Sequence, residues 1–143
     1  MGIHTDDGTT GWGEASPFPG IRELILDGLA PRLIGKNPTE IQRTWRNQWM
    51  VPYESALAVS AVDVALHDLW GKAVGLPVHQ LYGGAYRHNV PVYASAGLYL
   101  KDTDPGTHWP QETQRLVDGG FPAVKIRIGR FDPDYELPLL RSL

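Results

Sequence analysis

Apolar residues recur at helical spacing in three segments of the first half of the chain. The clearest pattern predicts a helix over residues 53–74, whose repeating apolar positions are Val59, Val62, Leu66, Leu69 and Ala73. Small residues occupy much of the remaining surface of this segment, which indicates close packing on more than one side. The same spacing predicts a helix over residues 21–33 and a shorter helix after Asn37.

The second half of the chain has a different pattern. Two short runs of β-forming residues, 90–96 and 123–129, alternate with helical patterns over residues 110–118 and from Asp132 onward. A strand, helix, strand, helix order is typical of a parallel sheet in an α/β domain. We therefore predict a boundary near residue 88, between a helix-rich region and the start of an α/β region.

The pattern near the N-terminus predicts a β-hairpin. Asp7 and Gly8 form a turn signature, because an Asp-Gly pair supplies the positive φ angles of a tight hairpin turn. An extended segment follows and ends near Glu14. Only five residues precede Asp6, so we expect one arm of this hairpin to be missing and the chain to be a piece of a longer protein.

The composition is that of one globular domain, with 143 residues of which 42% are apolar and 20% charged. The net charge of −3 argues against a nucleic-acid-binding protein. The lack of cysteine excludes disulfides and thiolate metal sites. No apolar run approaches the roughly 20 residues of a membrane span, and the first residues do not form a signal peptide. We expect a cytoplasmic protein that binds neither nucleic acid nor membranes.

Two cations on the second β-run are the main candidates for chemistry. Lys125 and Arg127 alternate with apolar residues and so lie on the same face of the predicted strand. If that face lines a (β/α)₈ barrel, the cations could bind a carboxylate and stabilise negative charge that develops on it. If the strand lies at a sheet edge, both charges are simply solvated. Glu14 enters a Gly/Pro-rich loop, where it could face a substrate or act as a structural acceptor.

Other chemical patterns are incomplete. The glycines Gly11 and Gly13 imitate a dinucleotide-binding fingerprint, but the third position is Ser16 and a Pro-rich loop follows instead of a helix. Asp63 and His67 are spaced to share one helix face, but a metal site would need a third ligand. Local hydrogen bonding or charge pairing is the expected role of this pair.

Three stretches, taken in order along the chain, resemble one enzyme family. They are GTTGWGEA at residues 8–15, AVSAVDVALHDLWGKAVGLPVHQLYGG at residues 58–84, and GFPAVKIRIG at residues 120–129. By these motifs the chain resembles the enolase superfamily, and within it the mandelate racemase / muconate lactonizing enzyme group. The resemblance implies an α+β capping domain over residues 1–88, mostly helical here and with its first strands missing. Residues 89–143 would then be the first two β/α units of a (β/α)₇β TIM-like barrel, which this chain leaves incomplete.

The resemblance also implies a chemistry, namely the Mg²⁺-dependent abstraction of the proton α to a carboxylate through an enediolate. Lys125 matches the first residue of the family's K-x-K motif and would act in catalysis by contacting the substrate carboxylate. Arg127 stands where the family usually has a second lysine. Because arginine keeps its proton far above neutral pH, we expect an electrostatic or acid role for it. Glu14 would lie on the capping-domain side of the pocket, where it could bind substrate.

These features favour an acid-sugar dehydratase as the parent enzyme. A racemase, epimerase or cycloisomerase of the same family is the alternative. A truncated chain with no activity of its own is an alternative of another class. The resemblance implies a small-molecule carboxylate as substrate and a homo-oligomeric parent. The family's Mg²⁺ ligands lie on later barrel strands, so we expect no metal-binding residues and no tight Mg²⁺ binding in this chain.

Overall fold

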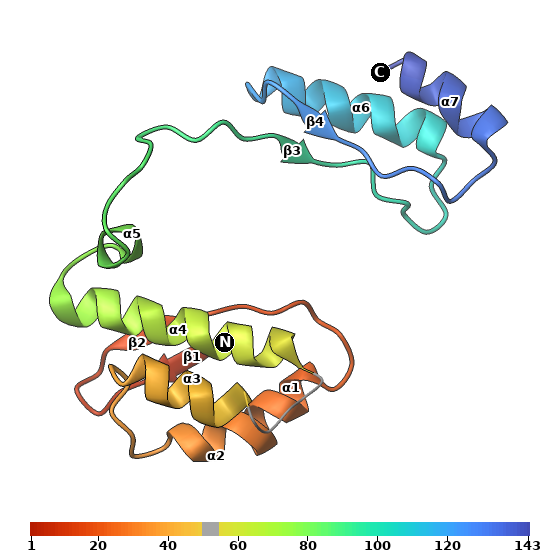
Figure 1. The fold of residues 1–143 in the computed structure, drawn as a ribbon. Helices are drawn as coiled ribbons and strands as arrows, with labels where there is room; N and C mark the ends of the chain where they lie inside the picture. Colours follow the sequence, from red (N-terminus) through yellow and green to blue (C-terminus); the bar gives the residue numbers. More distant parts are fainter. Residues whose placement is uncertain (50–54) are drawn as a thin grey trace. The chain divides into compact units, whose positions relative to one another are not determined.

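The computed structural model describes residues 1–49 and 55–143. They form two compact units, Met1–Tyr86 and Arg87–Leu143 (Figure 1). The assignment of residues 1–88 and 89–143 to two domains stays a prediction. No helix among the described residues has the length and apolar character needed to cross a membrane.

The first unit begins with a complete, short β-hairpin. Strand β1 (Gly2–His4) pairs antiparallel with β2 (Thr10–Trp12), and the turn between them contains Gly8 at a φ of 86°. Hydrogen bonds between Met1 and Gly13 extend the pairing by one position. The expectation that one arm is missing was wrong, because five residues suffice for a three-residue strand.

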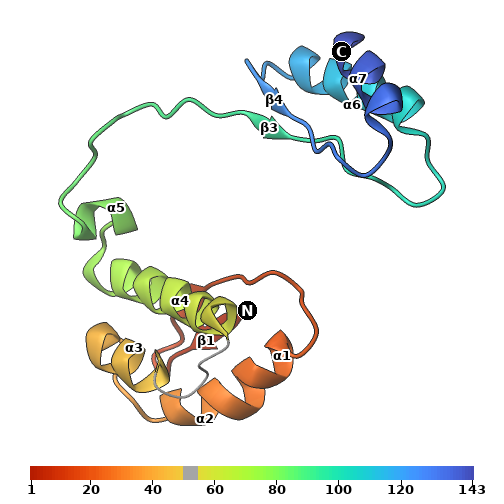
Figure 2. The same cartoon turned by 45° about the vertical axis from the view of Figure 1, so that its right-hand side comes forward.

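Helices make up the rest of the first unit. A continuous helical segment consists of α1 (Ile21–Glu23), the π-helical stretch η1 (Leu24–Leu29) and α2 (Ala30–Leu33), which confirms the helix predicted over residues 21–33. Helix α3 (Ile41–Trp49) follows and lies beside α4 (Ala56–Val74) (Figure 2). A short helix, α5 (Val78–Leu81), comes last.

Helix α4 has clear signals at both ends. The Oγ of Ser55 accepts a hydrogen bond from the backbone N–H of Ala58, and Gly75 ends the helix in the left-handed conformation that favours glycine. The start predicted at residue 53 lies outside the described residues.

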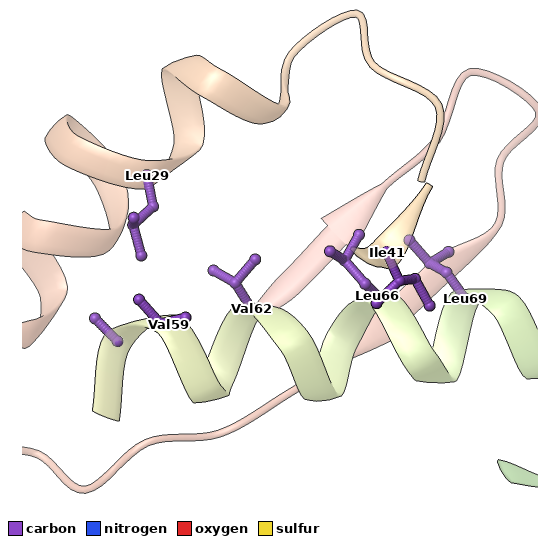
Figure 3. Close-up of a cluster of buried hydrophobic side chains, with 7 residues drawn as sticks. Leu29, Ile41, Val59, Val62, Leu66 and Leu69 are labelled. Carbon is purple, nitrogen blue, oxygen red and sulfur yellow. The ribbon is translucent and has the colours of Figure 1, made fainter. Parts of the chain in front are cut away.

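One face of α4 forms the core of the first unit. Figure 3 shows its apolar side chains directed toward Leu29 and Ile41. The predicted core positions are confirmed, except that Ala73 is exposed, because the covered part of α4 ends at Gly71. The buried cluster contains Leu29, Ile41, Ala58, Val59, Val62, Leu66 and Leu69.

The hairpin packs on another side of α4. The Oδ2 of Asp68 accepts hydrogen bonds from the backbone N–H of Trp12 at 2.8 Å and from Nζ of Lys72 at 2.7 Å. The same ammonium group donates to the backbone carbonyl of Thr10 at 2.6 Å. Polar side chains of the helix therefore hold the backbone of β2 in place.

The second unit is a β–α–β–α segment, which confirms the predicted alternation. Strand β3 (Ala94–Ser95) pairs in parallel with β4 (Val124–Lys125), and Ser95 lies opposite Lys125. Helix α6 (Pro105–Asp118) connects the strands and lies along the pair, and α7 (Pro133–Arg141) follows β4 (Figure 1). Both strands are shorter than the β-runs that predicted them, and α6 starts earlier than residue 110.

Candidate functional site

Lys125, the last residue of β4, and Arg127, two residues after it, are exposed cations of the second unit. Lys125 and Arg127 are exposed, whereas the intervening Ile126 and the preceding Val124 are half-buried. The strand therefore turns its apolar side toward the unit and its cationic side outward. Within residues 1–49 and 55–143, neither cation forms an ion pair with a carboxylate. Both positive charges are thus available to an anionic ligand.

The loop after β3 is fixed by a carboxylate and a glycine. The backbone N–H of Gly97 donates to the Oε2 of Glu112 on α6 at 2.9 Å. Gly97 has a φ of 64°, and a Cβ at this position would lie 2.5 Å from a methyl carbon of Ile126. Only glycine fits here, because both the backbone angle and the space exclude a side chain.

The loop after β4 is organised by Glu136, a residue of α7 that the motif analysis did not identify. Its side chain is buried, and its carboxylate accepts hydrogen bonds from the hydroxyl of Tyr99 and from the backbone of Gly129, both at 2.6 Å. The backbone N–H groups of Phe131 and Arg130 also donate to it, at 3.0 and 3.2 Å. An acidic residue in the first turn of a helix that follows a strand was the only sequence signal for this role.

These hydrogen bonds determine the charge of the carboxyl group. The Tyr99 hydroxyl, followed by the backbone N–H groups of the loop, lowers the pKa of Glu136 to about 2, against the opposing effect of burial. Burial, together with the hydrogen bond to Glu136, raises the pKa of Tyr99. At neutral pH the pair is therefore a carboxylate and a neutral phenol.

Acid should weaken the second unit as Glu136 takes up a proton. The pKa of a glutamate in an unfolded chain is about 4.3. Because the folded pKa is lower, the carboxylate contributes its full stability above about pH 4.3 and loses it as the pH falls through about 2. The difference in melting temperature between wild type and Glu136→Gln should be largest at neutral pH and shrink below about pH 4. A difference that is constant with pH would contradict this assignment.

The other candidate residues lie in the first unit. Glu14 is exposed and borders a surface hollow beside Leu57 and Ser60. The Nδ1 of His67 lies 2.8 Å from the carbonyl oxygen of Asp63 and 3.4 Å from its carboxylate, and its Nε2 contacts the Tyr82 hydroxyl. The expected local role of this pair is confirmed.

The glycines that imitate a nucleotide-binding motif have a packing role. Gly11 and Gly13 place the backbone of the hairpin directly against the backbone of α4 near Ala65 and Ala61. This contact leaves no room for a side chain at either glycine.

Comparison with known proteins identifies the family. The model of the mandelate racemase / muconate lactonizing enzyme N-terminal domain matches residues 1–83. The chain belongs to this family. It is 36% identical to a D-galactonate dehydratase family member of Paenibacillus sp. (strain JDR-2), over 90% of this chain and 33% of that protein. It is 33% identical to the D-galactonate dehydratase of Variovorax paradoxus (strain S110), over 87% of this chain and 33% of that protein.

Solved structures of the mandelate racemase / muconate lactonizing family have the same fold. One from Paracoccus denitrificans Pd1222 has a TM-score of 0.85 and 29% identity, over 99% of this chain and 42% of that one. Another from this organism, complexed with magnesium, has a TM-score of 0.77 and 31% identity, over 93% and 38% of the two chains. The expected fold is confirmed: a mostly helical α+β capping domain leads into the start of the family's barrel. The chain spans about a third of the length of the curated relatives it matches.

The described residues contain no group of side chains suited to a metal ion. Across the described parts of the chain, no three His, Asp or Glu side chains are grouped so that they could hold a metal ion. Glu136 and Glu112 are each occupied by hydrogen bonds to backbone N–H groups. The described residues therefore offer no Mg²⁺ ligand set of their own.

Proposed function

We propose that this chain supplies the capping domain, residues 1–88, and the first two barrel units, residues 89–143, of an acid-sugar dehydratase. The observation that carries the proposal is the pair of exposed cations at the carboxyl end of the parallel strand β4, Lys125 in the strand and Arg127 two residues after it, separated by the half-buried Ile126. Relatives that match most of this chain are named as dehydratases of D-galactonate, D-xylonate and D-mannonate. The substrate class that follows is a small-molecule sugar acid.

In this proposal the two cations have different tasks. The ammonium group of Lys125 binds the substrate carboxylate. The guanidinium of Arg127 stabilises the negative charge that accumulates on the carboxylate oxygens as the α C–H bond breaks. Arg127 is not the base, because a guanidinium does not release its proton at neutral pH. The enediolate then loses its β-hydroxyl, which takes a proton from a general acid and leaves as water, and the resulting enol tautomerises to a 2-keto-3-deoxy acid.

The remaining parts of the enzyme come from outside this chain. The base that removes the α-proton and the ligands of Mg²⁺ would be supplied by later barrel strands. Glu14 would be a further residue that binds the substrate. We further propose that the complete enzyme is a cytoplasmic homo-oligomer, and that residues 1–143 alone neither turn over acid sugars nor bind Mg²⁺ tightly.

An isomerase is the second candidate. One relative, 30% identical over 89% of this chain, is a D-galactarolactone cycloisomerase of Agrobacterium fabrum (strain C58). One structural neighbour is a racemase from Streptomyces coelicolor A3(2), with a TM-score of 0.82. Arg127 favours the dehydratase, because a two-base racemase would need a group on this strand that exchanges protons at neutral pH.

The test follows the α-proton and the product separately. The complete enzyme containing residues 1–143 is incubated with Mg²⁺ and a set of sugar acids in D₂O. A dehydratase should form a 2-keto-3-deoxy acid from at least one of them, measured as its semicarbazone. Deuterium at Cα without keto-acid formation would indicate the isomerase instead. A folded enzyme that exchanges no α-proton of any acid would contradict both, and residues 1–143 alone serve as the inactive control.

A further inference from the structure

Glu136 joins two loops that are far apart in the sequence. Its partner Tyr99 lies in the segment after β3, and its backbone partners Gly129, Arg130 and Phe131 lie in the segment after β4. Both segments leave the carboxyl ends of two parallel strands. This is the edge at which α/β folds place their ligands.

These contacts satisfy the hydrogen-bonding capacity of the Glu136 carboxylate. Its Oε2 accepts from Gly129, while its Oε1 accepts from the Tyr99 hydroxyl and from the backbone of Arg130 and Phe131. The side chain of Glu136 is 4% exposed. A buried carboxylate is retained only where hydrogen bonds compensate for lost water, and here all of its partners belong to the two loops. The loops cannot separate without leaving these groups unsatisfied.

Aromatic contacts reinforce the same junction. The ring of Tyr99 meets Trp109 edge-on at 5.5 Å and Phe131 at 5.6 Å, between ring centroids. The guanidinium of Arg130 lies over the Tyr99 ring, 5.6 Å from its centroid. Trp109 is completely buried, so this cluster is anchored in the interior of the second unit.

We propose that Glu136 is a positioning residue for the cationic strand. By holding residues 129–131 against Tyr99, its carboxylate fixes the carboxyl end of β4 and therefore the direction of Lys125 and Arg127. This inference rests on the proposed function, because these are the two residues that would contact the substrate. Glu136 itself is buried, so it would act through its contacts with the two loops and not by touching the substrate.

The test uses Glu136→Gln with Asp134→Asn as the matched control. Both variants remove one carboxylate from the first turn of α7, but Asp134 is exposed and takes no part in the junction. In Glu136→Gln the amide NH₂ must face a backbone N–H or the Tyr99 hydroxyl, because the carboxylate receives donors on both oxygens. Tyr99→Phe removes a single hydrogen bond and serves as the milder variant if Glu136→Gln does not fold.

Two readouts separate positioning from mere stability. Amide hydrogen exchange of residues 129–131 should accelerate by about tenfold or more in Glu136→Gln and stay unchanged in Asp134→Asn. In the complete enzyme, kcat per folded molecule should fall by about 100-fold, with KM changing by less than about threefold. A purely structural role would lower the melting temperature but leave kcat of the folded enzyme intact.

The outcomes are distinct. Slow exchange of residues 129–131 that persists in Glu136→Gln would overturn the junction. Faster exchange with an unchanged kcat would overturn the positioning role. If the wild-type enzyme acts on no sugar acid, the proposed function is wrong. Glu136 would then have no positioning role in that reaction, even if amide exchange of residues 129–131 accelerates in Glu136→Gln.

Discussion

Replacing Lys125 with alanine in the complete enzyme should reduce kcat/KM for the sugar acid by about 10²–10³-fold. The ammonium group is exposed on the cationic side of β4 and has no ion-pair partner in the described residues, so its charge is available to the substrate carboxylate. Its removal should cost little stability, because surface substitutions usually change the free energy of unfolding by less than about 0.5 kcal/mol. Steady-state kinetics and thermal unfolding of the same preparation measure both effects.

Two further variants sharpen this measurement. Arg115→Ala removes an exposed cation from α6 in the same unit and should leave kcat/KM near the wild-type value. Lys125→Arg keeps the charge but changes its shape, so an intermediate loss is expected. Near-normal kcat and KM in Lys125→Ala would remove this lysine from the site. An equal loss in Arg115→Ala would show that the unit responds to its net charge and not to this position.

Replacing Gly13 with alanine should destabilise the first unit by about 3 kcal/mol or more, the upper range of overpacking effects. A Cβ at Gly13 would overlap the carbonyl oxygen of Ala61 and lie 3.0 Å from the backbone nitrogen of Ala65. These are backbone atoms in the middle of α4, so they cannot move aside as a flexible side chain would. Relief would require the hairpin to separate from the helix, which would also stretch the hydrogen bond from Trp12 to Asp68.

Gly28→Ala is the matched control for this prediction. Gly28 lies in η1 with no atom near the position of an added Cβ and with no positive φ. Alanine there should be neutral or stabilising by up to about 1 kcal/mol, because it is the better helix former. Chemical denaturation of both variants gives the two free energies of unfolding. Equal stability of Gly13→Ala and wild type would mean that the hairpin does not pack on α4 as described.

The geometry of this packing explains two sequence patterns together. Gly11 and Gly13 are two positions apart on an extended segment, a distance of about 6.8 Å. Ala61 and Ala65 are four positions apart on a helix, a distance of about 6.0 Å. The two spacings nearly match, so the helix atom nearest to each glycine is the carbonyl oxygen of one alanine, Ala65 for Gly11 and Ala61 for Gly13. Each pattern was visible in the sequence, but only their contact shows that the glycines serve packing and not phosphate binding.

Other differences between prediction and structure also come from long-range contacts. The hairpin was expected to lack an arm, yet pairing between residues 1–5 and 9–13 completes it. Ala73 continues the apolar period of α4 but is exposed, because the part of α4 that other elements cover ends before it. Apolar spacing alone does not predict where that covered part ends. Glu136 was not identified because its partner Tyr99 is 37 positions away and no motif links them.

The helices and the buried face of α4 could be predicted from the chain pattern, because the helical spacing of apolar residues is a local property. The same patterns predicted the β–α–β order of the second unit and the exposure of Lys125 and Arg127 around the half-buried Ile126, and the motifs predicted the family. The contacts between distant residues could be seen only in the folded chain: glycine against helix backbone in the first unit, and the Glu136 carboxylate between two loops in the second. These contacts depend on close packing and on the pairing of buried hydrogen-bonding groups between residues far apart in the sequence. A local sequence pattern contains no information about such partners.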